Sequence, residues 1–452
     1  MKTRMFASLA FAVVFAVSCL GFSAANGLGV LPEPAYAAYN ALSATQPDDQ
    51  DMGVTTQAAT KETSTSNATK KPAKPAKAQL KAFKKASADF SLELFGRCVA
   101  SKGKGANVTI APMSVLNALA ITANGAGGKT ARQMRKVLGD GASMTRINKN
   151  LRWYNSRLVN VKRARINQAN SIWYHNDGTL TMKKKFLTTS KKFYKAEIKP
   201  VDFSDPVTVD AINGWVADNT NNMIKRVVDQ LDPNDRIAIV NALYFDAEWA
   251  SPFEKDMVKT RTFTTTTGKK RKVKMMFSTE GKYIEGENVT GFIKPYARGY
   301  KYVALLPKKG MSLKKFVSTL DGDTFRKLVA SAKKTAVNVG LPKYSLSYSN
   351  DGMQEQLAAM GITSAFTEDA NFLNMGKSIR GNLYIGEIVH KTKIDLDEQG
   401  TKAAAVTGIF MRDNAIHMDV KTVTLNRPFV YAIVDNATNL PVFIGAVNTL
   451  GK

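Results

Sequence analysis

The sequence predicts an α+β domain that starts near Leu80 and continues to the C-terminus of the 452-residue chain. From Leu80 onward, apolar residues recur at helical spacing through Phe83, Phe90 and Leu94, which favours a helix. Toward the other end, NRPFVYAIVDNATNLPVFIGAVNTL contains two apolar runs of strand length around an Asn-rich turn. A hydrophobic content of 44% supplies the core that a domain of this size needs.

The first 37 residues have the features of a secretory signal peptide. Two basic residues precede an apolar stretch at residues 5–17, and the small-residue site AYA ends at Ala37. That stretch is shorter than the ~20 residues of a membrane-spanning helix, so we expect cleavage after Ala37 and no transmembrane span. Cys19 follows AVS in a weakly lipoprotein-like pattern, which leaves a lipid anchor as the alternative.

Residues 38–79 predict a disordered tether that precedes a domain at residues 80–452. The tether consists mainly of Thr, Ser, Ala, Lys and Pro, so it cannot bury enough apolar surface to order itself. Loss of the signal peptide leaves Cys98 as the single cysteine, and the mature chain therefore forms no internal disulfide. Cys98 lies in the apolar helical pattern, which predicts a packed, unreactive thiol.

Two features suggest an enzyme at first sight, and neither fits. ANGAGGKT at residues 123–130 follows a relaxed phosphate-loop pattern, but the residues before it have helical spacing, whereas such a loop follows a strand. The three histidines are His175 in a predicted turn, His390 in an apolar strand pattern and His417 in an exposed loop. No zinc motif, paired cysteine ligands or nucleophile elbow accompanies them. We expect neither an enzyme nor a bound metal or cofactor.

The stretch DEQGTKAAAVTGI at residues 397–409 is the most informative in the chain. From Thr401 to Met411 every second residue is uncharged, so one face of an extended strand would carry no charge. Gly400 lacks a side chain where such a segment would pivot. The composition suits a linker, an edge strand or a segment that enters a sheet. The preceding GEIVHKTKIDLDE favours a long buried strand, with apolar side chains at Ile385, Ile388, Val389 and Ile394.

Together these motifs resemble the serpin family of serine protease inhibitors. The resemblance covers about residues 80–452 and rests on GAGGKTARQMRKVL, NALYFDAEWASPFEKDMVKTRTF, LPKYSLS, GITSAFTEDANFLNM and NRPFVYAIVD, in serpin order. It implies three β-sheets, with a large mixed sheet at the centre, surrounded by eight to nine helices and carrying an exposed reactive-centre loop. It also implies an exported, monomeric protein of bacterial type that is secreted or associated with the cell envelope.

The resemblance further implies a suicide-substrate mechanism. A target serine protease, or a cysteine protease, would attack the loop and form a covalent acyl-enzyme, after which the freed loop would insert into the large sheet. The hinge of this movement corresponds to Glu398, Gly400, Thr401, Ala403, Ala404 and Ala405. The short, neutral side chains of Thr401, Ala403, Ala404 and Ala405 favour an inhibitor over a non-inhibitory serpin, because a charge on the buried face would slow insertion.

Two supporting groups carry over from the family by position. At the top of the sheet, the group known as the breach corresponds to Lys343, Trp249 and Glu398, and we expect Glu398 to meet Lys343. Lower down, the hydrogen-bonded cluster known as the shutter corresponds to Ser114, Asn241 and His390. The family has Ser before the Pro of this helix start, whereas this chain has Ala111, which removes one hydroxyl.

The scissile bond is expected at Asn414–Ala415, because it usually lies about seventeen residues along when Glu398 is counted as the first. Arg412–Asp413 is the alternative, since Arg412 suits a trypsin-like protease. Met411 or Phe410 would instead suit an elastase- or chymotrypsin-like protease, and counting back from NRPF points near His417.

The formal net charge of +27 includes a basic cluster at Arg146, Lys149, Arg152, Arg157, Lys162, Arg163 and Arg165. Some serpins bind acidic polysaccharides through this region, so an acidic polysaccharide or an envelope polyanion is a candidate partner. A solvated basic surface is the simpler interpretation, and no motif indicates nucleic-acid binding. The alternatives to an inhibitor are a non-inhibitory serpin that acts as a binding protein and an envelope protein that binds polyanions.

Overall fold

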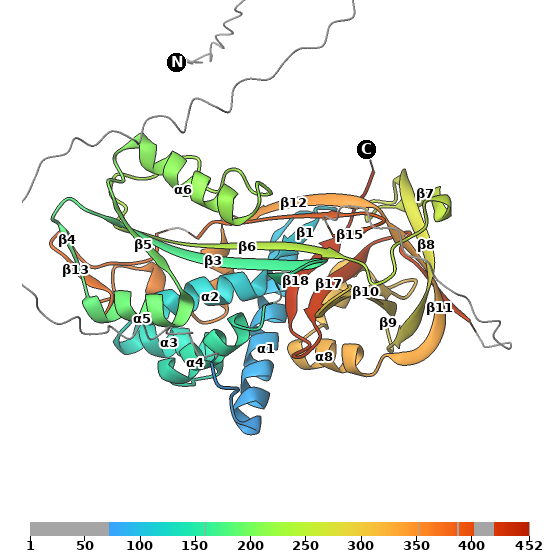
Figure 1. The fold of residues 1–452 in the computed structure, drawn as a ribbon, viewed down its shortest axis with the longest axis horizontal. Coiled ribbons are helices and arrows are strands. Elements are labelled where there is room, and N and C mark those ends of the chain that lie inside the picture. The colour runs from blue at the N-terminus through green and yellow to red at the C-terminus, as the bar shows by residue number, and fades with distance from the viewer. Residues whose placement is uncertain (1–71, 159, 351, 387, 402–419, 452) are drawn as a thin grey trace, which may run out of the picture. The chain divides into compact units, whose positions relative to one another are not determined.

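The computed structural model describes residues 72–158, 160–350, 352–386, 388–401 and 420–451. The predicted signal peptide, most of the predicted tether, the predicted scissile bonds, His417 and Ala403–Ala405 of the hinge lie outside these ranges. Within them the chain forms nine α-helices and three β-sheets, which confirms the α+β class and the three-sheet architecture (Figure 1). None of the helices in these ranges combines the length and the apolar character that crossing a bilayer requires.

The helices are α1 (Lys77–Ser101), α2 (Pro112–Ala123), α3 (Gly128–Gly139), α4 (Met144–Asn155), α5 (Lys184–Tyr194), α6 (Pro206–Asn219), α7 (Leu313–Ser318), α8 (Gly322–Ala330) and α9 (Met353–Ala359). Helix α1 begins three residues before the predicted domain boundary at Leu80. Residues 77–79 are exposed, so the apolar spacing that marks a helix in the sequence starts only afterwards. Cys98 of α1 is completely buried, and burial raises the pKa of its thiol to about 11.

The central sheet has the strand order β12–β14–β15–β6–β3–β2. Its strands are β12 (Tyr344–Asn350), β14 (His390–Leu396), β15 (Gly400–Thr401), β6 (Ile237–Glu248), β3 (Ala164–His175) and β2 (Asn160–Val161), and β5 (Glu197–Val201) pairs with β3. The β3–β5 pair is parallel and the other pairs are antiparallel, so the sheet is mixed, as predicted. Strands β3 and β6 form the longest ladder, from Ala164 opposite Ala247 to Tyr174 opposite Ile237.

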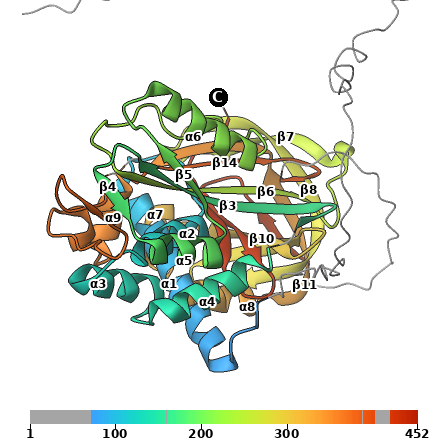
Figure 2. The same ribbon diagram turned by 60° about the vertical axis from the view of Figure 1, so that its left-hand side comes forward.

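Helices cover both faces of this sheet. Helix α6 lies on one side of β3 and β6, and α2 and α5 lie on the other (Figures 1 and 2). The face toward α6 packs a small cluster that includes Trp173, Trp215 and Ala242. The opposite face contributes to the larger core shared with α1, α2 and α4. Such coverage explains why β6 is apolar on both faces through its sequence ALYF.

The second sheet follows the order β1–β18–β17–β10–β9–β8–β11–β16, with β7 paired to β8. Its strands are β1 (Val108–Ile110), β7 (Val258–Thr264), β8 (Lys270–Glu285), β9 (Val289–Pro295), β10 (Tyr300–Pro307), β11 (Lys333–Pro342), β16 (Lys421–Thr424), β17 (Phe429–Asp435) and β18 (Pro441–Val447). A third sheet pairs β4 (Leu180–Met182) with β13 (Gly376–Ser378). The two apolar runs of the predicted C-terminal hairpin are β17 and β18.

The structure differs from two local predictions. His175 does not lie in a turn but ends β3 and is buried, because β3 extends to the point where β5 also ends. The long strand predicted through Ile385 begins only at His390, and Ile385, Ile388 and Val389 precede it as partly buried residues, of which Ile385 and Ile388 pack against the core. Apolar spacing alone does not distinguish a strand from an irregular segment that packs against a core.

The glycines of the phosphate-loop-like segment join two helices. Helix α2 precedes them and α3 follows, so the strand that a phosphate loop requires is missing at this place. The backbone at Gly125 lies against Met375, and Gly127 lies against Asn371, whose carbonyl accepts a 2.8 Å hydrogen bond from the Gly127 amide. These glycines therefore allow close packing against residues 371–375.

Candidate functional site

Strand β15 consists of only two residues and lies between β14 and β6. Thr401 pairs with Leu396 of β14 and with Ala247 of β6, and Gly400 pairs with Glu248. A side-chain carbon at position 400 would collide with the carbonyl of Ala247, so glycine is needed here for close approach of the two backbones. The chain thus enters the central sheet at Gly400, at the end where β6 terminates.

A tight turn at Asp397 delivers the chain to this point. The Asp397 carboxylate accepts hydrogen bonds from the amides of Gln399 (2.9 Å) and Gly400 (3.3 Å), and its own amide donates to the Gly400 carbonyl (2.9 Å). An Asp that bonds to amides two and three residues later is a recurrent turn former. Sequence reasoning missed this role, although the spacing D-x-x-G was available as a signal.

Trp249 lies directly against this turn. Its indole Nε1 donates to the Asp397 carbonyl (3.0 Å), its amide donates to the Gln399 carbonyl (2.8 Å), and the Phe253 amide donates to the Glu398 carbonyl (2.9 Å). Trp249 is completely buried and stacks on Tyr296, with ring centroids 4.4 Å apart. The segment from Trp249 to Phe253 therefore holds the turn by three hydrogen bonds.

Thr401 points into this aromatic cluster. Its hydroxyl is hydrogen-bonded to the Tyr296 hydroxyl at 2.6 Å, and the side chain is buried. Burial raises the pKa of Tyr296 above its ordinary range, so this phenol stays neutral. Thr401 is the first residue of the face that the sequence predicts to be uncharged, and its side chain is buried against Tyr296.

Lys343 and Glu398 meet at the solvent edge of the same region, with Nζ 2.9 Å from Oε2. Partial burial opposes ionisation of Glu398, but the hydrogen bond from Lys343, a backbone amide and the Lys343 charge together hold its pKa below the ordinary value. The structure thus brings all three predicted breach residues to the Asp397 turn. Because the side chains of both partners remain partly exposed, their attraction is screened by solvent.

Below Thr401 the central sheet is open. In the described part of the chain, no ladder pair joins β6 directly to β14, although β15 lies between them at the top. A cavity of about 30 Å³ lies between the two strands, lined by Leu243 from β6, Thr392 from β14 and Val227 from the segment after α6. This volume can hold about one water molecule. The gap is the place where a further strand would complete the sheet.

The predicted shutter residues line this cavity. The Ser114 hydroxyl donates to the Asn241 side-chain oxygen, and the Asn241 amide group donates to Asn170 (2.6 Å). Nε2 of His390 accepts from the Ala111 amide (3.2 Å), and burial lowers the pKa of His390 to about 4. His390 therefore lines the same cavity as Ser114 and Asn241. Its hydrogen bond, however, goes to the backbone of Ala111, the position at which the family pattern has Ser.

The segment that follows α6 covers the opening. The Asn213 side chain of α6 accepts from the amides of Val227 (2.7 Å) and Val228 (3.1 Å) and donates to the Val228 carbonyl (2.8 Å). Lys391 of β14 lies 3.6 Å from Asp229 of the same segment. A strand that entered between β6 and β14 would have to pass beneath this cover. Sequence reasoning did not find Asn213, because its partners lie fourteen to fifteen residues away in an irregular segment.

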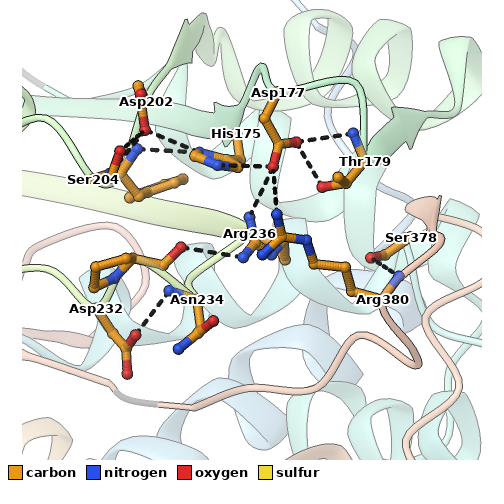
Figure 3. Close-up of polar contacts among 12 residues, drawn as sticks. His175, Asp177, Thr179, Asp202, Ser204, Asp232, Asn234, Arg236, Ser378 and Arg380 are labelled. Atoms are coloured by element: carbon orange, nitrogen blue, oxygen red, sulfur yellow. Dashed lines mark hydrogen bonds and ion pairs between the residues drawn. The ribbon is translucent and has the colours of Figure 1, made fainter.

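A polar network ties chain segments together at the opposite end of β3 and β6 (Figure 3). Asp177 accepts hydrogen bonds from Thr179 (2.9 and 2.6 Å) and lies within 3.1 to 3.6 Å of His175, Arg236 and Arg380. The hydrogen bond from the Thr179 hydroxyl is the main reason that the pKa of Asp177 falls to about 2. This carboxylate therefore stays ionised and joins the end of β3 to the start of β6 and to the segment after β13.

His175 is a structural member of this network. Its Nδ1 accepts from the Phe203 amide (3.1 Å), and its Nε2 faces Asp177. The neighbouring Ser204 hydroxyl donates to Asp202 (2.6 Å), so this serine is not activated by His175. The geometry does not support a Ser–His–Asp triad at this place.

The predicted basic cluster is spread over two settings. Arg146, Lys149 and Arg152 lie on α4, and Arg152 and Arg157 lie over the rings of Phe193 and Trp153. Arg163 instead bonds to Glu248 at the end of β6 (2.5 Å), close to the Asp397 turn. Arg146, Lys149, Arg157, Lys162, Arg163 and Arg165 are exposed, and Arg152 is half-buried.

Comparison with known proteins gives one family. The sequence model of the family described as "Serpin (serine protease inhibitor)" matches residues 85–450. The human plasma serine protease inhibitor is 28% identical over 369 residues, covering 80% of this chain and 88% of the relative. The native-state crystal structure of tengpin, a thermophilic serpin, is 44% identical with a TM-score of 0.77 and covers 81% of this chain and 94% of that chain. Human thyroxine-binding globulin, solved with its ligand, is 25% identical with a TM-score of 0.73 and covers 83% and 100% of the two chains.

Proposed function

This chain belongs to the serpin family, and we propose that it inhibits serine endopeptidases, with cysteine endopeptidases as a second class, by trapping them as covalent complexes. The observation that carries this proposal is the two-residue strand at Gly400 and Thr401, which lies between β6 and β14 above an unpaired gap. The family supports the coarser statement that the protein is a non-catalytic protease inhibitor.

The chemistry belongs to the target protease. Its nucleophile attacks the carbonyl carbon of Asn414, and the bond to the nitrogen of Ala415 breaks with that nitrogen leaving as a protonated amine. The carbonyl of Asn414 remains joined to the protease as an acyl-enzyme. We keep Arg412–Asp413 as the alternative bond. Loss of the peptide bond frees the segment after Thr401 to move while Gly400 keeps its place in the sheet.

The register of β15 indicates where the freed segment would go. Gly400 and Thr401 pair with Glu248 and Ala247, and the same register would place residue 403 opposite Phe245, residue 405 opposite Leu243 and residue 411 opposite Ile237. Residues directly opposite each other in antiparallel strands share a face. Ala403 and Ala405 would therefore take the face of Thr401, where small side chains fit beside the two large ones of β6.

The gain from insertion can be sized. Roughly ten further residues would gain ladder hydrogen bonds, each with a net value of about 0.5–1.5 kcal/mol, so insertion would yield on the order of 10 kcal/mol. This value is comparable to the stability of a whole domain. Asn414 would end just beyond the start of β6, beside the polar network of Asp177 and Arg236. The protease would then be held at the end of the sheet opposite Trp249.

The roles of the supporting residues follow from their contacts. Lys343, Glu398 and Trp249 would hold the pivot while the loop swings. Ser114, Asn241 and His390 would part and re-form around the inserted strand. We also propose that the protein acts outside the cell, as the human plasma serine protease inhibitor is named for plasma, and that it acts as a monomer.

A non-inhibitory binding protein is the second candidate, because thyroxine-binding globulin shares the fold over nearly the same length. One experiment separates the two. The mature chain is mixed with trypsin-, elastase-, chymotrypsin-, subtilisin- and legumain-like proteases, and each mixture is run on a denaturing gel with mass measurement of the released C-terminal peptide. A detergent-stable complex supports the trap, and the peptide mass identifies the bond. Cleavage at the loop without any complex, across the panel, would favour the binding protein.

A further inference from the structure

A lysine is buried behind the turn that delivers the loop to the sheet. Lys294 of β9 is only 1% exposed, and its Nζ lies 2.6 Å from the carboxylate of Glu280 on β8, which is 8% exposed. The Ser278 hydroxyl donates to the same carboxylate oxygen at 2.7 Å. None of these residues was singled out by the sequence, because both charges lie in strands that otherwise alternate as ordinary sheet.

The ammonium group also contacts the segment that holds the Asp397 turn. Nζ of Lys294 lies 4.2 Å from the ring centroid of Phe253 and 5.6 Å from that of Trp249. Cations at these distances are attracted by aromatic rings, and the attraction is largest where water is excluded. Lys294 thus joins Glu280 to the two aromatic residues whose segment donates three hydrogen bonds to carbonyls of residues 397–399.

A second path leads from the same strand to Thr401. Tyr296 follows β9 two residues after Lys294, stacks on Trp249 and binds the Thr401 hydroxyl. Trp249 and Tyr296 also form an isolated antiparallel bridge. Two sets of contacts that hold the loop at the top of the sheet, at the 397–399 carbonyls and at Thr401, therefore involve Trp249 and Phe253, which contact Lys294, and Tyr296, which lies two residues after it.

Stability alone gives little reason for this pair. Burial of an ammonium and a carboxylate removes their hydration, and such a pair is commonly replaced by apolar residues of similar size without loss of stability. Burial accordingly lowers the pKa of Lys294, against the attraction of Glu280. An apolar pair would not hold the side chain at position 294 in one place. The carboxylate of Glu280 does so, because it fixes the ammonium group against Phe253 and Trp249.

We propose that Lys294 and Glu280 are positioning residues that fix the 249–253 segment and, through it, the pivot on which the loop inserts. The purpose of the pivot rests on the proposed inhibitory function. The placement of the 397–400 turn by the buried pair does not, so it can be tested without a protease.

The test is hydrogen exchange measured by mass spectrometry on the full mature chain. We compare the double variant Glu280→Gln/Lys294→Met, which removes both charges with little change in size, with the unmodified protein. Peptides covering residues 245–254 and 394–401 are expected to exchange about tenfold faster, because the 249–253 segment is no longer fixed and the hydrogen bonds from the amides of Trp249 and Phe253 open more often. Peptides from β3 and β17 are expected to exchange as before.

The matched control is the double variant Glu285→Gln/Lys333→Met. This ion pair also has a 2.6 Å contact and also starts from β8, but both side chains are exposed and neither contacts residues 249–253. It is expected to leave exchange at 245–254 and 394–401 unchanged. Equal acceleration in the control, or acceleration throughout the sheets in the Lys294 variant, would show a merely structural role and overturn the proposal.

A second variant keeps the test decisive should the first one fold poorly. Glu280→Asp retains both charges but withdraws the carboxylate by one methylene, so it lengthens the 2.6 Å contact without adding an unpaired charge. Faster exchange confined to 245–254 and 394–401 supports the proposal, and unchanged exchange in a folded Glu280→Asp protein refutes it. Failure of the unmodified chain to trap any protease would refute the proposed function and leave this exchange result standing.

Discussion

Replacement of Thr401 by Arg is the sharpest perturbation of the proposed trap. The Thr401 side chain is 1% exposed and its hydroxyl bonds to buried Tyr296. Loss of that partner leaves a buried phenol unsatisfied, at a cost of about 1–3 kcal/mol. A guanidinium on the buried face adds several kcal/mol unless it is paired. The total is on the order of 5 kcal/mol, about half of the gain estimated for insertion.

Because Thr401 is already buried before cleavage, the arginine is expected to displace residue 401 from the sheet in the starting form, so that insertion must bury the guanidinium. A fraction of the penalty in that step is enough to change the outcome. Each 1.4 kcal/mol slows a step about tenfold, so hydrolysis of the acyl-enzyme should overtake insertion in the Thr401→Arg protein. We expect the number of inhibitor molecules consumed per protease to rise at least about tenfold while the loop is still cut. Densitometry of complex and cleaved inhibitor on denaturing gels measures this ratio.

Thr401→Ser is the matched control, because it keeps the hydroxyl and adds no charge. It should trap protease with the same stoichiometry as the unmodified chain. Equal stoichiometry in the Arg variant would refute the reasoning, since it would mean that residue 401 does not need to stay buried while the protease is captured.

Three further outcomes are expected. Lys343→Met should lower the free energy of unfolding of the uncleaved protein by no more than about 1 kcal/mol, because the pair with Glu398 is partly exposed. If the variant lost activity on warm storage much faster than this small difference allows, the ion pair would contribute more to stability than we expect. His390 stays neutral when folded and has a pKa near 4, against 6.5 unfolded, so stability should be constant above pH 6.5 and fall by about 3 kcal/mol between pH 6.5 and 4. Chemical denaturation across that range should lose this slope in His390→Gln. Cys98 should resist alkylation at pH 8 until the protein is unfolded, because its thiol is buried with a pKa of about 11.

The sequence was sufficient for the class of fold and for residues whose role depends on a recognisable pattern. The sequence could predict that three residues, Lys343, Glu398 and Trp249, lie together at the turn, because each lies in a motif that resembles the family. Asp397 was within reach, since its turn is local in sequence. His175 was misplaced because a polar WYHND segment resembles a turn, while the strand that covers it is distant in the chain.

Residues that act through distant partners were not accessible in this way. Asn213 binds a segment without regular structure, and Lys294 finds Glu280 only after β8 and β9 pair. A lysine in a predicted strand is assigned to a solvent-facing position unless the tertiary contacts are known. The same limit applies to Ile385, whose apolar character reflects packing at the margin of the core and not a strand.

The twelve-residue length of β6 has a consequence for variation of the loop. An extended chain advances about 3.3 Å per residue, so a strand paired along the whole of β6 would be roughly 40 Å long. Deletion of two residues between Thr401 and the scissile bond would leave a captured partner about 7 Å short of the far end, whichever residues were removed. In the proposed mechanism, the composition of the residues between Thr401 and the scissile bond can therefore change with the protease to be recognised, whereas their number is set by the length of β6.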